Sequence, residues 1–194
     1  MIRPFAGVQA VAAASQPVFG TTLTAAITPS VDKFTGTNRP GTSPPPIQIT
    51  VTSTAGFVQN DRIAVGPKTN FTAANRSKLD LGTITSVVDT THLLVQGLTQ
   101  AHASTDYVVL SEMCSAVYVV PVSTTAIIYL GTDETVGAAD ASVFDVIAKV
   151  SATTAEPTYW HSSPPTGRAD SYDTTQYWLL GTAADTFVAR FQQN

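Results

Sequence analysis

Short runs of apolar, β-branched and aromatic residues, separated by glycine, proline and asparagine, occupy the chain from residue 47 to its end. The clearest run, residues 47–52, alternates strictly between apolar and polar residues, which is the period of a half-buried strand. No segment keeps an apolar period of 3.6 residues over three helical turns, so we expect no long helix. The pattern therefore predicts an all-β fold.

The runs fall into two groups, which a chain of 194 residues is long enough to fold as two small domains. Residues 47–112 are predicted to form a small β-barrel or roll, with strands at 47–52, 62–65, 79–88, 92–98 and 107–110. Residues 115–194 are predicted to form a β-sandwich or jelly-roll, with strands at 117–122, 125–130, 143–150, 158–161, 176–180 and 186–191.

Residues 1–46 have a different composition and hold seven of the twelve prolines. Residues 36–46 read as a linker that ends in a stiff polyproline II segment. Ordering a residue costs about 1–2 kcal/mol, so an extended arm of this length needs apolar burial. We predict an extended N-terminal arm held by a neighbouring subunit or partner; wrapping around its own domain is the alternative. The residues predicted to make the docking contacts are Phe5, Phe19, Phe34, Pro44, Pro45 and Pro46.

The charge pattern excludes several classes of partner. Charged residues make up 12% of the chain, about half the usual share of roughly 25%, and 30 threonines keep the surface polar instead. Lysine and arginine are scattered, so we expect no direct binding of nucleic acid. No apolar run reaches 18 residues, so we expect no membrane contact. The short apolar N-terminal region, interrupted by Gln9, is not expected to be a signal peptide.

The sequence lacks the motifs of common catalytic sites. His92, His102 and His161 form no metal-binding pair, and there is no nucleophile elbow or phosphate-binding glycine loop. The single cysteine, Cys114, excludes an internal disulfide and is predicted to be a small buried core residue. We therefore expect no enzymatic activity, no metal and no cofactor.

Aromatic residues gather near the C-terminal end, at Trp160, Tyr172 and Trp178 among others. Packing in the core is the main interpretation. An exposed protein interface or stacking on a sugar ring are the alternatives, because large aromatic rings anchor both kinds of contact.

The first group of strands resembles small β-modules of tailed-bacteriophage virion proteins. The resemblance is carried by VTSTAGF at 51–57, NDRI at 60–63, GTITSV at 82–87, Leu98 and AHA at 101–103. Asn60 stands where such modules more often have glycine, and asparagine tolerates the left-handed conformation that the turn needs. The second group is similar in general pattern to the compact β-sandwiches of phage head decoration and cement proteins.

The resemblance implies a capsid decoration or cement protein that docks on the major capsid protein at the virion surface after assembly in the host cytoplasm. It also implies association with further copies of itself, as a homotrimer or another symmetric oligomer. Deletion of residues 1–46 is then expected to abolish particle binding and to leave a folded domain. A tail, baseplate or head-to-tail connector component is one alternative, and a carbohydrate-binding module is another.

Overall fold

A computed structural model of the chain describes residues 1–12, 14–29, 45–72, 74–122, 128–131, 135–136, 145–147, 159–162, 172–181, 183 and 185–193, without the side chains of 145–147, 159–162 and 172. The described residues form strands and short 3-10 helices, which confirms the all-β prediction. The strands are β1 (Ile2–Ala10), β2 (Gln16–Pro17), β3 (Gly20–Thr22), β4 (Ile47–Thr50), β5 (Arg62–Gly66), β6 (Asp80–Val87), β7 (His92–Gln96), β8 (Tyr107–Leu110), β9 (Met113–Pro121), β10 (Ile128–Gly131), β11 (Asp145–Ile147), β12 (Tyr159–Ser162), β13 (Tyr172–Asp173), β14 (Trp178–Gly181) and β15 (Thr186–Gln193). The 3-10 helices are η1 (Lys68–Phe71), η2 (Arg76–Lys78) and η3 (Thr174–Gln176).

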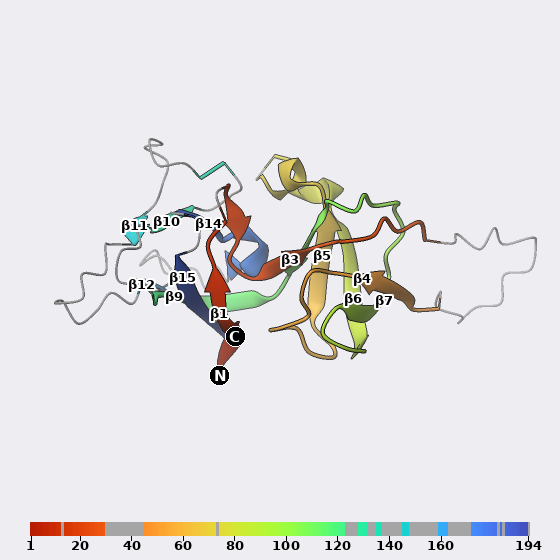
Figure 1. Cartoon of the computed structure of the whole chain (residues 1–194), viewed down its shortest axis with the longest axis horizontal. Coiled ribbons are helices and arrows are strands. Elements are labelled where there is room, and N and C mark those ends of the chain that lie inside the picture. The colour runs from red at the N-terminus through yellow and green to blue at the C-terminus, as the bar shows by residue number, and fades with distance from the viewer. Residues whose placement is uncertain are drawn as a thin grey trace, which may run out of the picture.

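Strands β4 to β8 lie in one strongly curled antiparallel sheet with the order β3-β8-β5-β6-β7-β4 (Figure 1). All five strands predicted between residues 47 and 112 are present, and the turn before β5 has Asn60 at φ 73°, the left-handed conformation expected there. The two ends of this sheet approach one another where Leu23 bridges Val51. The backbone N–H of Thr24 donates to the carbonyl of Thr50 at 2.9 Å, so the sheet curls into a small barrel closed by a strand from the N-terminal region.

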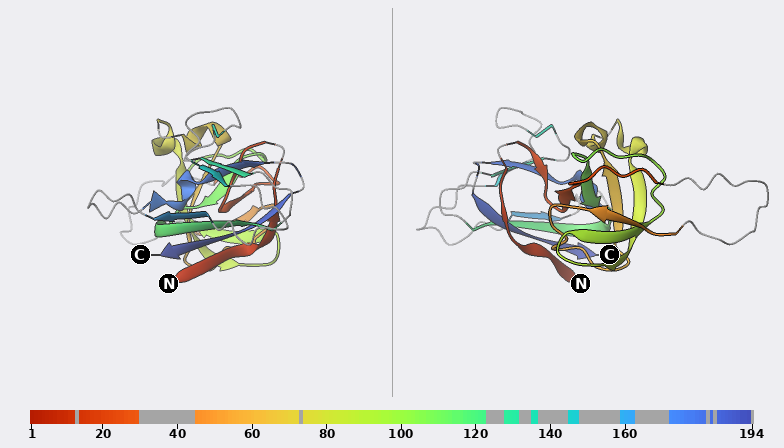
Figure 2. Two further views of the ribbon diagram at one scale, coloured as in Figure 1. Left: turned by 90° about the vertical axis from the view of Figure 1, so that its left-hand side faces the viewer. Right: turned by 45° about the vertical axis from the view of Figure 1, so that its right-hand side comes forward.

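Two further sheets lie beside this barrel, as Figures 1 and 2 show. One has the order β1-β15-β9-β12, with β13 also paired to β9, and the other has the order β11-β10-β14-β2. They share one apolar core, in which Val117 and Phe187 of the first sheet and Leu179 of the second are fully buried. Two sheets that pack through inward side chains form a sandwich.

Residues 1–29, which we call the N-terminal segment, run along all three sheets (Figure 1). β1 is the edge strand of the first sandwich sheet, β2 is the edge strand of the second, and β3 is an edge strand of the barrel sheet. The segment is extended, as predicted, but it packs on its own chain. Within one chain the segment is buried on its own domain, as the alternative interpretation expects, and the prediction that a neighbouring subunit holds it stays a prediction.

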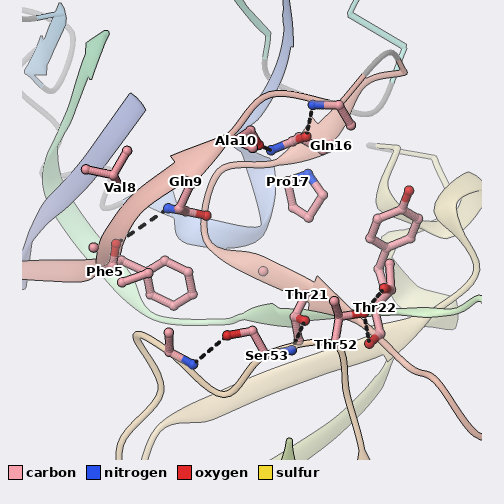
Figure 3. A pocket seen from close by; sticks show the side chains of 16 residues that line it. Phe5, Val8, Gln9, Ala10, Gln16, Pro17, Thr21, Thr22, Thr52 and Ser53 are labelled. Carbon is pink, nitrogen blue, oxygen red and sulfur yellow. Dashed lines mark hydrogen bonds between the residues drawn. The ribbon is translucent and has the colours of Figure 1, made fainter. Parts of the chain in front are cut away.

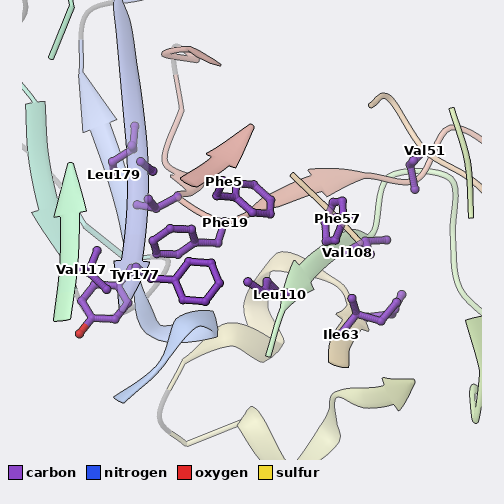
Figure 4. Packing of buried hydrophobic residues seen from close by; sticks show 14 of the residues in the cluster. Phe5, Phe19, Val51, Phe57, Ile63, Val108, Leu110, Val117, Tyr177 and Leu179 are labelled. Atoms are coloured by element: carbon purple, nitrogen blue, oxygen red, sulfur yellow. The ribbon is translucent and has the colours of Figure 1, made fainter. Parts of the chain in front are cut away.

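Two phenylalanines of the N-terminal segment are buried in the core of the chain itself. The side chains of Phe5 and Phe19 are 1% and 0% exposed, and their rings pack edge to face at a centroid distance of 5.6 Å. Phe5 also packs against Phe57 of the barrel, and Phe19 against Phe191 of the sandwich. Figure 4 shows the rings of Phe5 and Phe19 between the sandwich and the barrel. Both rings complete the chain's own core and are not exposed to a capsid surface, so a docking role for Phe5 and Phe19 between subunits stays a prediction.

Candidate functional site

A cleft with a volume of about 490 Å³ lies along the N-terminal segment, between the sandwich and the barrel (Figure 3). It lies within the size range of ordinary ligand-binding clefts. Its walls are formed by backbone, small apolar residues, and hydroxyl or amide side chains. The lining residues are Phe5, Ala6, Gly7, Val8, Gln9, Ala10, Ala12, Gln16, Pro17, Gly20, Thr21, Thr22, Thr52, Ser53, Ala55 and Tyr107.

The chemistry of this cleft is neutral. None of its lining residues is a carboxylate, imidazole, amine, guanidinium or thiol. General acid–base and nucleophilic catalysis depend mainly on such groups, although a tyrosine is sometimes used. The cleft is therefore suited to binding through shape and hydrogen bonds.

One wall of the cleft is the outer edge of β1, which is interrupted by a bulge. The register with β15 shifts between Phe5 and Gln9, and Ala6 has a positive φ of 55°. Beyond the bulge, the side-chain amide of Gln16 donates to the carbonyl of Ala10 at 3.1 Å and accepts from the backbone N–H of Ala12 at 2.5 Å (Figure 3). A neighbouring parallel strand would make the same pair of bonds, so Gln16 occupies the position of an added strand.

A buried ion pair fixes β1 to the barrel. The guanidinium of Arg3 donates to both carboxylate oxygens of Asp61, at 2.5 and 2.6 Å, and to the carbonyl of Gly56 at 2.7 Å. The side chain of Arg3 is 15% exposed and that of Asp61 is 4% exposed. A Cβ atom at Gly56 would lie 2.6 Å from the backbone N of Ala6, so only glycine allows this close approach.

A second buried polar cluster anchors the end of the N-terminal segment. The two ring nitrogens of His102 lie 3.1 Å from a carboxylate oxygen of Asp80 and 3.2 Å from one of Asp106. The backbone of His102 exchanges hydrogen bonds of 2.9 and 3.0 Å with that of Ile27. All three polar side chains are buried, so their arrangement holds structure in place and is closed to a substrate. His102 is thus a packed residue of the core.

Most of the remaining predicted site residues lie outside the part of the chain that the structure describes. Phe34 and Pro44 lie outside the described residues, as do the side chains of Trp160 and Tyr172, so those predictions stay predictions. Pro45 and Pro46 are exposed before β4.

Trp178 is 0% exposed, so the prediction of an exposed interface aromatic is wrong at that position. Its ring packs against Phe71 and Tyr107, with centroids at 5.4 and 5.3 Å, and its indole N–H donates to the carbonyl of Thr175 at 3.1 Å. Its apolar surface and its only donor are therefore both satisfied inside the chain, as the main interpretation of core packing predicts.

Sequence reasoning missed the contacts that hold the N-terminal segment. Arg3 and Asp61 are 58 positions apart, and Gln16 lies among small residues without a periodic pattern. The available signal was the single arginine in an otherwise apolar start, which suggests a carboxylate partner but does not identify it.

The described part of the chain contains no group of three or more histidine, cysteine, aspartate or glutamate residues arranged to hold a metal ion. Within the same residues, no helix has the length and apolar character needed to cross a bilayer. No family model, curated protein or solved structure gives a significant match to this chain.

Proposed function

We propose that this chain is a non-enzymatic structural protein that decorates and stabilises a tailed-phage capsid by docking on the major capsid protein lattice. Stabilisation by such a protein is mass action, because a ligand that binds only the assembled shell favours the assembled shell. The observation that carries the proposal is the neutral cleft along the N-terminal segment, whose backbone, hydroxyl and amide groups suit protein contacts better than catalysis. The virion-like motifs at 51–57, 60–63 and 82–87 support the phage assignment, and they fall on the strands and turns of the barrel.

A second observation supports docking and indicates where it occurs. Met1, Ile2 and Met113 are 93%, 51% and 50% exposed. The backbone N–H of Gln193 donates to the carbonyl of Met1, and Gln193 also pairs with Cys114, which follows Met113. The three apolar side chains therefore belong to one end of the sheet β1-β15-β9, which we call the methionine end. Exposed methionines adapt to irregular partner surfaces, and clusters of exposed apolar groups mark interaction sites.

The alternatives differ in their structural support. A tail or connector component would fit the neutral cleft equally well and differs from a decoration protein in copy number. Trp178 gives no support to a sugar-binding module, because its ring is buried. Stacking of Trp160 on a sugar stays a prediction.

Quantitative mass spectrometry of purified particles tests the proposal. We expect hundreds of copies per particle; tens or fewer would favour a tail component, and absence from particles would contradict a virion role.

A pair of variants with the same starting exposure tests the docking face. Met113 and Val88 are each 50% exposed, but only Met113 lies at the methionine end. We expect Met113→Gln to weaken binding to undecorated particles about tenfold, the loss expected when one buried apolar contact of about 1.4 kcal/mol is removed. Val88→Gln, in the turn between β6 and β7, is expected to bind as the unmodified protein does. Equal binding by both variants would contradict docking at the methionine end.

A further inference from the structure

We propose that the N-terminal segment is exchanged between copies of this chain. In an assembly, residues 1–29 of one copy occupy the corresponding groove of a second copy, and the contacts described within one chain then join two. This names a second copy as a partner and rests on the proposed function only for the high local concentration of copies on a particle.

The backbone pairings of the described part of the segment support exchange. β1 pairs with β15, β2 with β14 and β3 with β8, so each ladder joins the segment to a distant part of the chain. The bonds internal to the segment, such as those of Gln16 to Ala10 and Ala12, would move with it. A segment from a second copy would therefore make the same hydrogen bonds without losing any of its own.

The groove that the segment fills is specific for its sequence. Phe5, Phe19, Val18 and Leu23 are each 0–1% exposed and complete a core shared by barrel and sandwich. The body also contributes the Asp61 carboxylate that Arg3 pairs with at one end of the groove. The side chains that line the groove, and the three sheet edges beside it, match residues 1–29 at each of these contacts. The same segment of a second copy is therefore the occupant that fits.

The connection to the body is longer than its local geometry needs. Thr24 and Thr50 are hydrogen-bonded neighbours on adjacent strands, a pairing that hairpins achieve with loops of about 2–5 residues. Here residues 28–46 intervene between the bridge at Ile27 and the start of β4. At about 3.3 Å per residue a chain of this length spans at most about 60 Å. A compact domain of this size is about 40 Å across, so the connection is long enough to reach a neighbour.

In the closed form a chain holds its own N-terminal segment, and in the exchanged form it holds that of a second copy. Both forms make the same contacts, so the protein concentration decides which one is populated. A connection of this length holds its own segment at an effective concentration on the order of 1 mM. Dilute chains therefore stay closed, whereas copies held side by side on a surface, or refolded near that concentration, exchange segments. Since release of the segment exposes Phe5 and Phe19, an exchanged form should separate slowly after dilution.

A disulfide trap distinguishes the two forms. The backbone N–H of Val11 donates to the carbonyl of Asp185, which makes the adjacent pair, Ala10 and Thr186, a non-hydrogen-bonded pair of the β1–β15 ladder. Such a pair has a Cα separation of about 4.5 Å, at the short end of the range for disulfides, and the native Cys114 is buried. The double variant Ala10→Cys with Thr186→Cys is refolded at about 1 mM and at about 1 μM, oxidised, and analysed by non-reducing electrophoresis.

We expect covalent dimers and larger species from the concentrated sample, and an intramolecular disulfide from the dilute sample. Each single cysteine variant is the control and should give no ladder of covalent species beyond a dimer. Monomeric disulfide at both concentrations would overturn the exchange. Sedimentation of the unmodified protein, refolded at the same two concentrations, gives the same answer if the double variant does not fold. A monomer that still binds particles would refute exchange alone, whereas covalent oligomers that bind no particle would refute docking alone.

Discussion

Replacing Arg3 by alanine should destabilise the whole molecule, although Arg3 is the third residue of the chain. The substitution removes three hydrogen bonds from the guanidinium and its stacking over Phe191, whose ring centroid lies 5.4 Å away. It leaves the Asp61 carboxylate 4% exposed in the native geometry, with the backbone N–H of Val58 as a remaining donor. Breaking a buried ion pair in this way costs about 3–5 kcal/mol. For a chain of this size that corresponds to a fall in Tm of about 10 °C.

Urea unfolding followed by circular dichroism measures this loss as a lower midpoint at unchanged slope. Arg3→Lys keeps the charge but not the planar fork, so we expect an intermediate loss. The variant Asp61→Asn and its combination with Arg3→Ala complete a double-mutant cycle, in which we expect a coupling energy of about 2 kcal/mol or more. A loss below about 1 kcal/mol for Arg3→Ala would refute the argument that this pair fixes β1 to the barrel.

Three further predictions follow from named groups. Burial, with Asp173 nearby, raises the pKa of the Cys114 thiol to about 12, so the folded protein should not react with a thiol reagent at pH 8. Because only the unfolded chain ionises this thiol above its usual pKa of 9.0, stability should fall as the pH rises from 9 towards 12, and Cys114→Ala should abolish that fall. Hydrogen bonds from the backbone of Thr91 and the side chain of His92 lower the pKa of Asp89 from 3.8 to about 2; the stability advantage over Asp89→Asn should be present above pH 4 and lost as the pH falls through about 2. Finally, His102→Ala should cost more than about 2 kcal/mol, since two buried carboxylates lose their shared partner, and it should speed hydrogen exchange at Ile27.

The barrel strands were predictable from the sequence because their signal is local. Alternation at 47–52 and the turn residues around Asn60 and Gly66 are read within a few residues, and β4 to β8 begin and end close to the predicted positions. The burial of Cys114 was predictable for the same reason, since it lies between two apolar runs. In the second half, each of the six predicted strands overlaps a strand of the structure, and the two-residue strand β13 was missed.

The role of the N-terminal segment was not predictable because its signal is non-local. The energetic premise was sound: an extended segment needs apolar burial to offset its ordering entropy. That premise does not say whose surface provides the burial. Phe5 packs against Phe57 and Phe19 against Phe191, each partner more than 50 positions later in the sequence, and no local pattern identifies that cavity. Deletion of residues 1–46 should therefore leave an aggregating body with open sheet edges, and not the folded domain expected from the sequence.

Two of the seven prolines in residues 1–46, Pro4 and Pro17, protect sheet edges in the described part of the N-terminal segment. Met1 and Gln193 form a hydrogen-bonded pair, which places Pro4 at a position of β1 whose backbone faces away from β15. On β2, the backbone N–H of Val18 donates to the carbonyl of Tyr177, so the backbone of the adjacent Pro17 faces away from β14. At both positions the missing N–H is the one that an added strand would need, and proline is tolerated in sheets only there. Together with the Gln16 amide beside Ala10, these residues block the addition of a foreign strand at the β1 and β2 edges of the sandwich. At these two edges a partner must therefore bind through side chains, as at the methionine end, or replace the N-terminal segment as a whole.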